Sequence, residues 1–132
     1  MNLLLDTEVL IWIQTNSPRI STTAREYLLD PNVVKWISEV SLFEIAIKQK
    51  IGKLNEFNTT LPDYIRQVQK DHFRLLPIRN QHITAYAQIP LFEEHRDPFD
   101  RLILATALHE QWPVMASDRK FSWYNNLIEV IW

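Results

Sequence analysis

The sequence contains no cysteine and only one glycine, Gly52, among its 132 residues. Without cysteine, the chain can form no disulfide, no thiolate nucleophile and no cysteine-based zinc site. The single glycine excludes both glycine-rich phosphate loops, GxGxxG and GxxxxGK[ST], because each of them needs several glycines within one short segment. Nucleotide binding by a Rossmann domain or a P-loop is therefore ruled out.

Long hydrophobic runs and a strong charge bias are also missing. No uncharged apolar stretch approaches the roughly 18 residues that a membrane-spanning helix needs. The first apolar run follows no basic segment and is interrupted by Asp6, which is unlike a signal peptide. With 14 Lys and Arg against 16 Asp and Glu, the chain lacks the basic excess typical of duplex-DNA binding. We therefore expect a cytoplasmic protein without a membrane segment.

Length and composition predict a single globular domain over residues 1–132. The chain is 46% hydrophobic and 23% charged, which is an ordinary globular balance. One domain usually takes roughly 100–200 residues, and no repeat, low-complexity tract or linker divides this sequence.

Short apolar segments alternate with helical patterns along the chain. The apolar segments predict strands at residues 3–5, 33–37, 73–76, 114–116 and 127–131. The helical patterns cover residues 7–14, 22–29, 42–54, 62–70, 81–87 and 98–111. Alternation of this kind predicts an α/β fold with a parallel sheet covered on both faces. In such sheets the functional site lies beyond the carboxyl ends of the strands, where the strand order switches.

Four acidic residues fall where such a sheet would place its site. Asp6 directly follows the first strand and Asp118 follows the fourth, so they can meet only if those strands are neighbours. Glu44 and Asp100 lie near the starts of the helices predicted over 42–54 and 98–111. Two charges about 4 Å apart repel by on the order of 4 kcal/mol at an effective dielectric near 20. A hard cation such as Mg²⁺ or Mn²⁺ would offset that repulsion, because oxygen ligands suit these ions.

Each acid also has a purely structural interpretation. Asp6 could cap the helix that follows it, and Asp118 could belong to a turn. Ser41-Leu42-Phe43-Glu44 matches a capping box, and Asp97-Pro98 matches an N-cap followed by proline at the first helical position. Only the joint pattern of the four acids favours a metal site.

Four segments of the chain resemble, in order, the successive motifs of PIN-domain nucleases. They are residues 3–7 (LLLDT), 37–45 (ISEVSLFEI), 95–105 (HRDPFDRLILA) and 116–121 (ASDRKF). The subgroup they resemble most is the VapC-type toxin of bacterial toxin–antitoxin pairs. The resemblance implies a single PIN-like α/β/α sandwich with a central five-stranded parallel sheet. It also implies an endoribonuclease that depends on one or two Mg²⁺ or Mn²⁺ ions, and a small antitoxin protein as partner.

The resemblance implies a role for individual residues as well. The metal-holding and catalytic positions of the family match four acids, Asp6, Glu44, Asp100 and Asp118. Thr7 and Ser117 match hydroxyl positions that support the site, and Asp97 matches a recurrent acid of the subgroup. Many family members carry a further Asn or Asp shortly after the fourth acid, whereas this chain continues as RKFSW. That departure weakens the case for Mg²⁺ at a second metal position.

Basic, aromatic and histidine residues supply secondary expectations. Arg96, Arg101 and Arg119 flank the acidic motifs and are expected to contact RNA phosphates. His95 precedes Asp97 and Asp100; a solvated loop histidine is the favoured interpretation, and contact with substrate is the alternative. The five tryptophans favour core packing or a homodimer surface over base stacking.

Two other functions remain open at this point. A PIN-like fold that has lost catalysis would only bind a partner, although the presence of all four acids argues against it. An aspartyl phosphotransferase is the second alternative, because Leu5-Asp6-Thr7-Glu8 nearly matches an Asp-x-Asp nucleophile motif after a strand. The pattern favours an endoribonuclease over both.

Overall fold

Five short strands form one sheet in which every neighbouring pair is parallel, in the order β3-β2-β1-β4-β5. The computed structural model describes residues 1–132. The strands are β1 (Asn2–Leu5), β2 (Val34–Ser38), β3 (Arg74–Leu76), β4 (Val114–Met115) and β5 (Val130–Ile131). The predicted five-stranded parallel sheet is therefore confirmed, although β4 and β5 are shorter than the sequence suggests.

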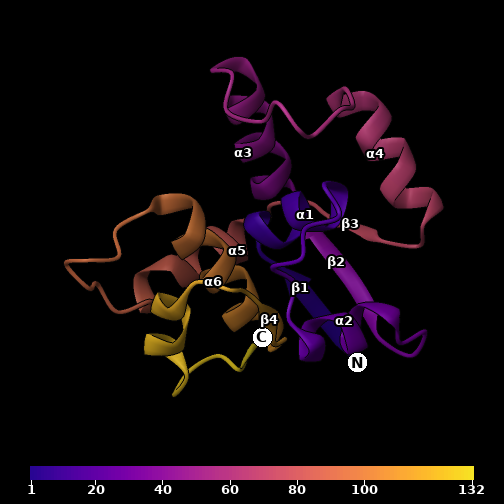
Figure 1. Cartoon of the computed structure of the whole chain (residues 1–132). Coiled ribbons are helices and arrows are strands. Elements are labelled where there is room, and N and C mark those ends of the chain that lie inside the picture. Colours follow the sequence, from indigo (N-terminus) through magenta and orange to yellow (C-terminus); the bar gives the residue numbers. More distant parts are fainter.

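Helices cover both faces of the sheet (Figure 1). They are α1 (Thr7–Gln14), α2 (Thr22–Leu29), α3 (Glu39–Lys50), α4 (Leu61–Lys70), α5 (Asn80–Ala85) and α6 (Pro98–Glu110). Two 3₁₀ helices, η1 (Tyr86–Gln88) and η2 (Arg119–Tyr124), complete the chain. None of these helices is both long enough and apolar enough to cross a lipid bilayer.

The central strand β1 contributes side chains to two separate cores. Leu3 and Leu5 pack into one core with α1, α2 and α4, whereas Leu4 packs into the other with α5, α6 and η2. This division follows from strand geometry, because successive side chains point to opposite faces of a sheet. All three leucines are fully buried, so the strand is apolar on both faces, as expected of a parallel sheet between two helical layers.

The strand order reverses between β1 and β4. Strands β2 and β3 lie on one side of β1, while β4 and β5 lie on the other, with Leu5 aligned to Met115. Asp6 and Asp118 therefore leave neighbouring strands at the same edge of the sheet, as the sequence analysis required. Ligand sites in open α/β sheets lie at such a switch point.

Helix α3 differs from its predicted position, and the difference matters for the site. The helix begins at Glu39, where Ser38 Oγ accepts a hydrogen bond from the Val40 N–H at 3.0 Å, rather than near residue 42. The expected capping box ending at Glu44 is therefore wrong, because Glu44 lies in the second turn. Two apolar residues of the segment predicted as a helix face solvent, since Phe43 and Ile51 are 60% and 58% exposed.

Candidate active site

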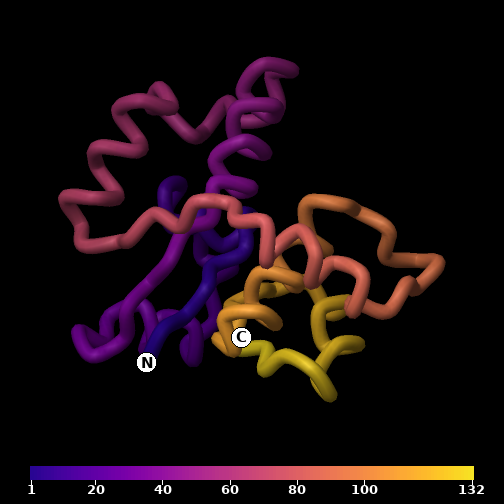
Figure 2. Tube along the Cα trace, turned by 180° about the vertical axis from the view of Figure 1, so that it is seen from behind, coloured from indigo at the N-terminus to yellow at the C-terminus, as the bar shows by residue number.

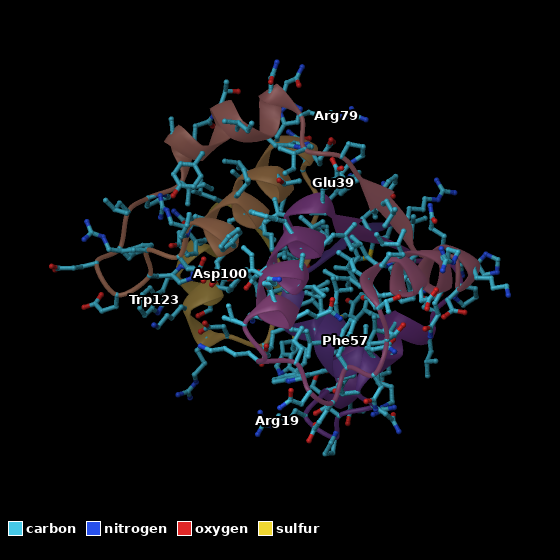
Figure 3. The ribbon with its side chains drawn as sticks, turned by 90° about the horizontal axis from the view of Figure 1, so that it is seen from above. Arg19, Glu39, Phe57, Arg79, Asp100 and Trp123 are labelled. Carbon is cyan, nitrogen blue, oxygen red and sulfur yellow. The ribbon has the colours of Figure 1, made fainter.

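A cleft of about 240 Å³ lies beyond the carboxyl ends of β1 and β4, and it brings the predicted site residues together. Its lining includes seven predicted residues: Asp6, Thr7, Glu44, Asp97, Asp100, Ser117 and Asp118. Glu8, Lys48 and Phe121 also line it. Figure 3 looks down onto this end of the sheet, with Asp100 beside α3. A larger hollow of about 620 Å³, between the end of α1 and residues 53–57, has one acid in its lining, Glu56.

Asp6 is the most buried acid of the cleft. It follows β1, its backbone N–H donates to the Met115 carbonyl at 3.0 Å, and the residue is only 4% exposed. Its carboxylate forms no capping hydrogen bond with α1, and Oδ1 has no hydrogen-bond partner at all. Asp6 therefore occupies the N-cap position of α1, as its structural interpretation supposed, but without a capping hydrogen bond from its side chain. Its carboxylate instead faces the other acids.

The environment of Asp6 disfavours its charge. Burial raises the pKa of Asp6 well above its ordinary value, and the negative charges of Asp100 and Glu44 raise it further. The backbone N–H groups of Thr7 and Glu8 act in the opposite direction. A buried carboxylate with an unpaired oxygen is costly unless a cation or donor supplies the missing interaction.

Glu44 reaches the cleft from the second turn of α3. Its Oε1 is buried without a hydrogen-bond partner, and its Oε2 lies 3.5 Å from Lys48 Nζ, one turn further along the helix. The Thr7 hydroxyl donates to Ser41 Oγ at 2.9 Å and so joins the start of α1 to α3. This contact explains why the segment that follows β1 and the helix that carries Glu44 lie on the same side of the cleft.

Asp100 lies in the first turn of α6, after the predicted cap. Asp97 Oδ1 accepts a hydrogen bond from the Phe99 N–H at 2.9 Å, which confirms Asp97 as the N-cap, while Asp97 also lines the cleft. Burial raises the pKa of Asp100 to about 6, although the hydrogen bond with His95 opposes the increase. Asp100 therefore adds a second carboxylate whose pKa is raised, although it is still mostly ionised at neutral pH.

His95 is buried next to the cleft, and the favoured interpretation of a solvated loop histidine is wrong. It is 3% exposed rather than solvated, and its Nε2 lies 3.0 Å from Asp100 Oδ2. The other ring nitrogen, Nδ1, lies 2.8 Å from the hydroxyl of Tyr124, a residue 29 positions away. No local sequence signal predicts such a contact, since it depends on how the loop before α6 packs against η2.

Asp118 follows β4 and serves two roles at once. Its Oδ1 accepts a hydrogen bond from the Lys120 N–H at 2.9 Å and caps η2, whereas its structural interpretation was a turn residue. It also lines the cleft next to Ser117. The atoms of His95, Asp100 and Asp118 that could bind a metal ion lie within 4.8 Å of one another. Capping and participation in the acidic cluster are therefore compatible.

The expectation that Arg101 contacts substrate is wrong. The residue is 3% exposed, and its guanidinium donates to the Tyr86 hydroxyl at 3.0 Å and to the carbonyls of Ile89 and Pro90 at 3.0 and 2.7 Å. It anchors the start of the loop between α5 and α6, which extends away from the body of the molecule in Figure 2. Arg96 and Arg119 are exposed and remain predicted substrate contacts.

The raised carboxyl pKa values predict how the stability of the metal-free protein depends on pH. The unfolded chain ionises these groups near pH 4, before the folded protein does, so the folded state loses stability as the pH rises. In EDTA, the melting temperature of the wild type should therefore fall as the pH rises from about 4 through about 6, the pKa of Asp100. Asp6→Asn should flatten this decline, because it removes the most disfavoured charge.

Thermal melts followed by circular dichroism measure this effect. Asp71→Asn, at the exposed end of α4, is the matched control and should keep the wild-type pH dependence. If the melting temperature falls equally steeply with pH in the wild type and in Asp6→Asn, the electrostatic description of the cleft is contradicted.

Comparisons with known proteins agree with the observed fold. The structure is similar in fold to VapBC2 from Rickettsia felis, solved with a DNA fragment from its promoter, at a TM-score of 0.70, 18% identity and 98% coverage of both chains. VapBC-1 from nontypeable Haemophilus influenzae aligns with a TM-score of 0.64 and 20% identity over 98% of this chain and 96% of that one. A toxin–antitoxin complex from Klebsiella pneumoniae aligns with a TM-score of 0.61 and 18% identity over 98% of this chain and 96% of that one.

The sequence comparisons concern the family. No curated protein matches the chain in sequence. The family model of the PIN domain, however, matches residues 3–126, which include Asp6, Glu44, Asp100 and Asp118, most of β1 and the whole of β2, β3 and β4. The chain therefore belongs to the PIN domain family.

Proposed function

We propose that the protein is a divalent-metal-dependent endoribonuclease and the toxin of a type II toxin–antitoxin pair. One observation carries the proposal: Asp6 Oδ1 and Glu44 Oε1 are both buried without a hydrogen-bond partner. Both belong to a cleft that Asp100 and Asp118 also line. A buried carboxylate oxygen without a hydrogen-bond partner costs about 1–3 kcal/mol, so a fold that keeps two of them has a use for them.

The donor set of the cleft fits Mg²⁺ or Mn²⁺. Oxygen ligands from carboxylates suit these hard ions, and Asp6, Glu44, Asp100 and Asp118 would hold one or two of them. When bound, such an ion supplies a Lewis acid that activates water and neutralises charge on the phosphodiester. The Thr7 hydroxyl already donates to Ser41, which leaves hydrolysis by water favoured over attack by this side chain.

Lys48 is the one cationic side chain that lines the cleft. Its ammonium group lies 3.5 Å from Glu44 Oε2. We infer that Lys48 binds a phosphate oxygen of the RNA next to the scissile bond, since Lys contacts fix the register of a nucleic-acid backbone. Arg96 and Arg119 would extend this contact along the strand.

A small antitoxin protein is the proposed protein partner. The solved structures with a similar fold include complexes named VapBC and a toxin–antitoxin complex, which supports a partner of this kind. The acidic cleft would accept an arginine from the tail of such a partner, because guanidinium and carboxylate groups form strong paired hydrogen bonds. Homodimerisation and action in the cytoplasm stay predictions of the sequence analysis.

The first test of the function removes one charge from the cleft. Asp6→Asn should lower RNA cleavage by more than the roughly 10–100-fold that loss of an outer-shell partner costs, because a metal ligand is lost. Its fold should survive, and Mn²⁺ should raise its melting temperature less than that of the wild type. The measurement is cleavage of a structured RNA with Mg²⁺ or Mn²⁺, with circular dichroism as the fold control.

The Asp71→Asn variant should cleave like the wild type. Turnover by Asp6→Asn at the wild-type rate would remove Asp6 from the catalytic site. A wild type that binds Mn²⁺ without cleaving any RNA would instead favour the inactive binding module, and a stable phosphate label on Asp6 would favour the phosphotransferase.

The second test concerns Lys48. Lys48→Met should lower kcat/KM for RNA by about 10–100-fold, the equivalent of the 1.5–3 kcal/mol that a charged hydrogen bond contributes. Its affinity for Mn²⁺ should be unchanged or higher, because Glu44 loses a competing positive charge. Lys70→Met, an exposed lysine at the end of α4, is the control. An unchanged kcat/KM in Lys48→Met would limit Lys48 to its ion pair with Glu44.

A further inference from the structure

The loop before α6 places a histidine where both of its ring nitrogens are engaged. His95 lies between Asp100 and Tyr124, with Nε2 3.0 Å from Asp100 Oδ2 and Nδ1 2.8 Å from the Tyr124 hydroxyl. The ring also packs at 5.7 Å from Phe121 and 5.6 Å from Tyr124, centre to centre. Any rotation of the ring would break both polar contacts, so its orientation is tightly held.

The position of this histidine links two parts of the site. Its backbone N–H donates to the Phe92 carbonyl at 3.0 Å, which closes the loop that leads into α6. Tyr124 is fully buried at the end of η2, the helix that Asp118 caps. Figure 3 shows Asp100 and Trp123, the neighbour of Tyr124, on the same side of α3. His95 therefore joins the segment carrying Asp100 to the segment carrying Asp118.

The direction of the hydrogen bonds follows from what each group can donate. An ionised carboxylate only accepts hydrogen bonds, so an Asp100 that holds a cation requires a proton on His95 Nε2. In a neutral imidazole Nδ1 then carries a lone pair, which accepts the Tyr124 O–H. The donors therefore run from Tyr124 to His95 to Asp100. In this arrangement Nε2 has no lone pair for a metal, and His95 is not part of the cleft lining.

We propose that His95 is a positioning residue: held by Tyr124, it donates to Asp100 Oδ2 and so favours coordination of the cation through Oδ1 alone over coordination through both oxygens. This proposal rests on the metal site of the proposed function. Coordination through one carboxylate oxygen suits Mg²⁺ and Mn²⁺, which favour octahedral oxygen sites. Ca²⁺ takes six to eight ligands and often binds both oxygens of a carboxylate. His95 thus sets the preference of the site for small ions over Ca²⁺.

Two substitutions of His95 separate its two contacts. The amide nitrogen of His95→Gln reaches about as far as Nε2 and keeps a donor for Asp100. The amide of His95→Asn reaches only about as far as Nδ1, so it keeps the Tyr124 contact and loses the one to Asp100. Tyr124→Phe removes the hydroxyl that fixes the ring. Tyr64→Phe is the matched control, because it removes a hydroxyl from another buried tyrosine, on α4.

The experiment measures the Kd of the full chain for Mn²⁺ and for Ca²⁺ by calorimetry, without RNA. The wild type should bind Mn²⁺ more tightly than Ca²⁺. The ratio of the Kd for Ca²⁺ to the Kd for Mn²⁺ should fall by about tenfold in His95→Asn. This is the lower end of the effect of losing an outer-shell partner. Tyr124→Phe should shift the ratio in the same direction by less. His95→Gln and Tyr64→Phe should keep the wild-type ratio.

An unchanged ratio in both His95→Asn and Tyr124→Phe would overturn the proposal, as would equal losses in His95→Asn and His95→Gln. If His95→Asn does not fold, Tyr124→Phe against Tyr64→Phe decides the question. A wild type that binds Mn²⁺ but cleaves no RNA contradicts the proposed nuclease alone, since the ion preference is measured without RNA. A wild type that binds neither ion contradicts both.

Discussion

The repulsion among buried carboxylates is the constraint on which the rest of the site depends. Asp6 is placed at the end of the central strand, with its carboxylate almost fully buried and facing Asp100 and Glu44. Neither a backbone N–H of α1 nor any other donor forms a hydrogen bond with its Oδ1. The surrounding elements hold the acids in place despite this cost: Thr7 binds Ser41 between α1 and α3, and His95 binds Asp100 at the start of α6.

Much of the fold could be predicted because local signals and the overall topology agree. Helices α1 and α2 have the bounds that their patterns predict, and the five apolar segments pair into a parallel sheet. The four acids could be predicted as a cluster for the same reason, since strand ends and helix starts converge at one edge. Helix α3 was displaced in the prediction because Ser38 and Ser41 are both good cap residues, and only the end of β2 decides between them.

The residues that were misjudged are those whose roles depend on distant parts of the chain. Arg101 follows Asp100 directly and was expected at the substrate, yet the adjacent helical position points into the core, toward Ile89 and Pro90. His95 was expected in solvent, yet it is covered by η2, whose formation the sequence did not indicate. In both cases a polar side chain of the motif is buried and stabilises a neighbouring part of the site: Arg101 holds a loop, and His95 holds the Asp100 carboxylate.

The most direct measurement of the central claim is anomalous diffraction from crystals of the wild-type protein grown with Mn²⁺. The account predicts an anomalous peak in the cleft between β1 and β4, within reach of Asp6 and Asp100, with Glu44 and Asp118 around it. It also predicts that Asp6 Oδ1 or Glu44 Oε1, which have no partner in the metal-free arrangement, will contact the ion or its water shell. Crystals saturated with Mn²⁺ that show no peak in this cleft would contradict the account.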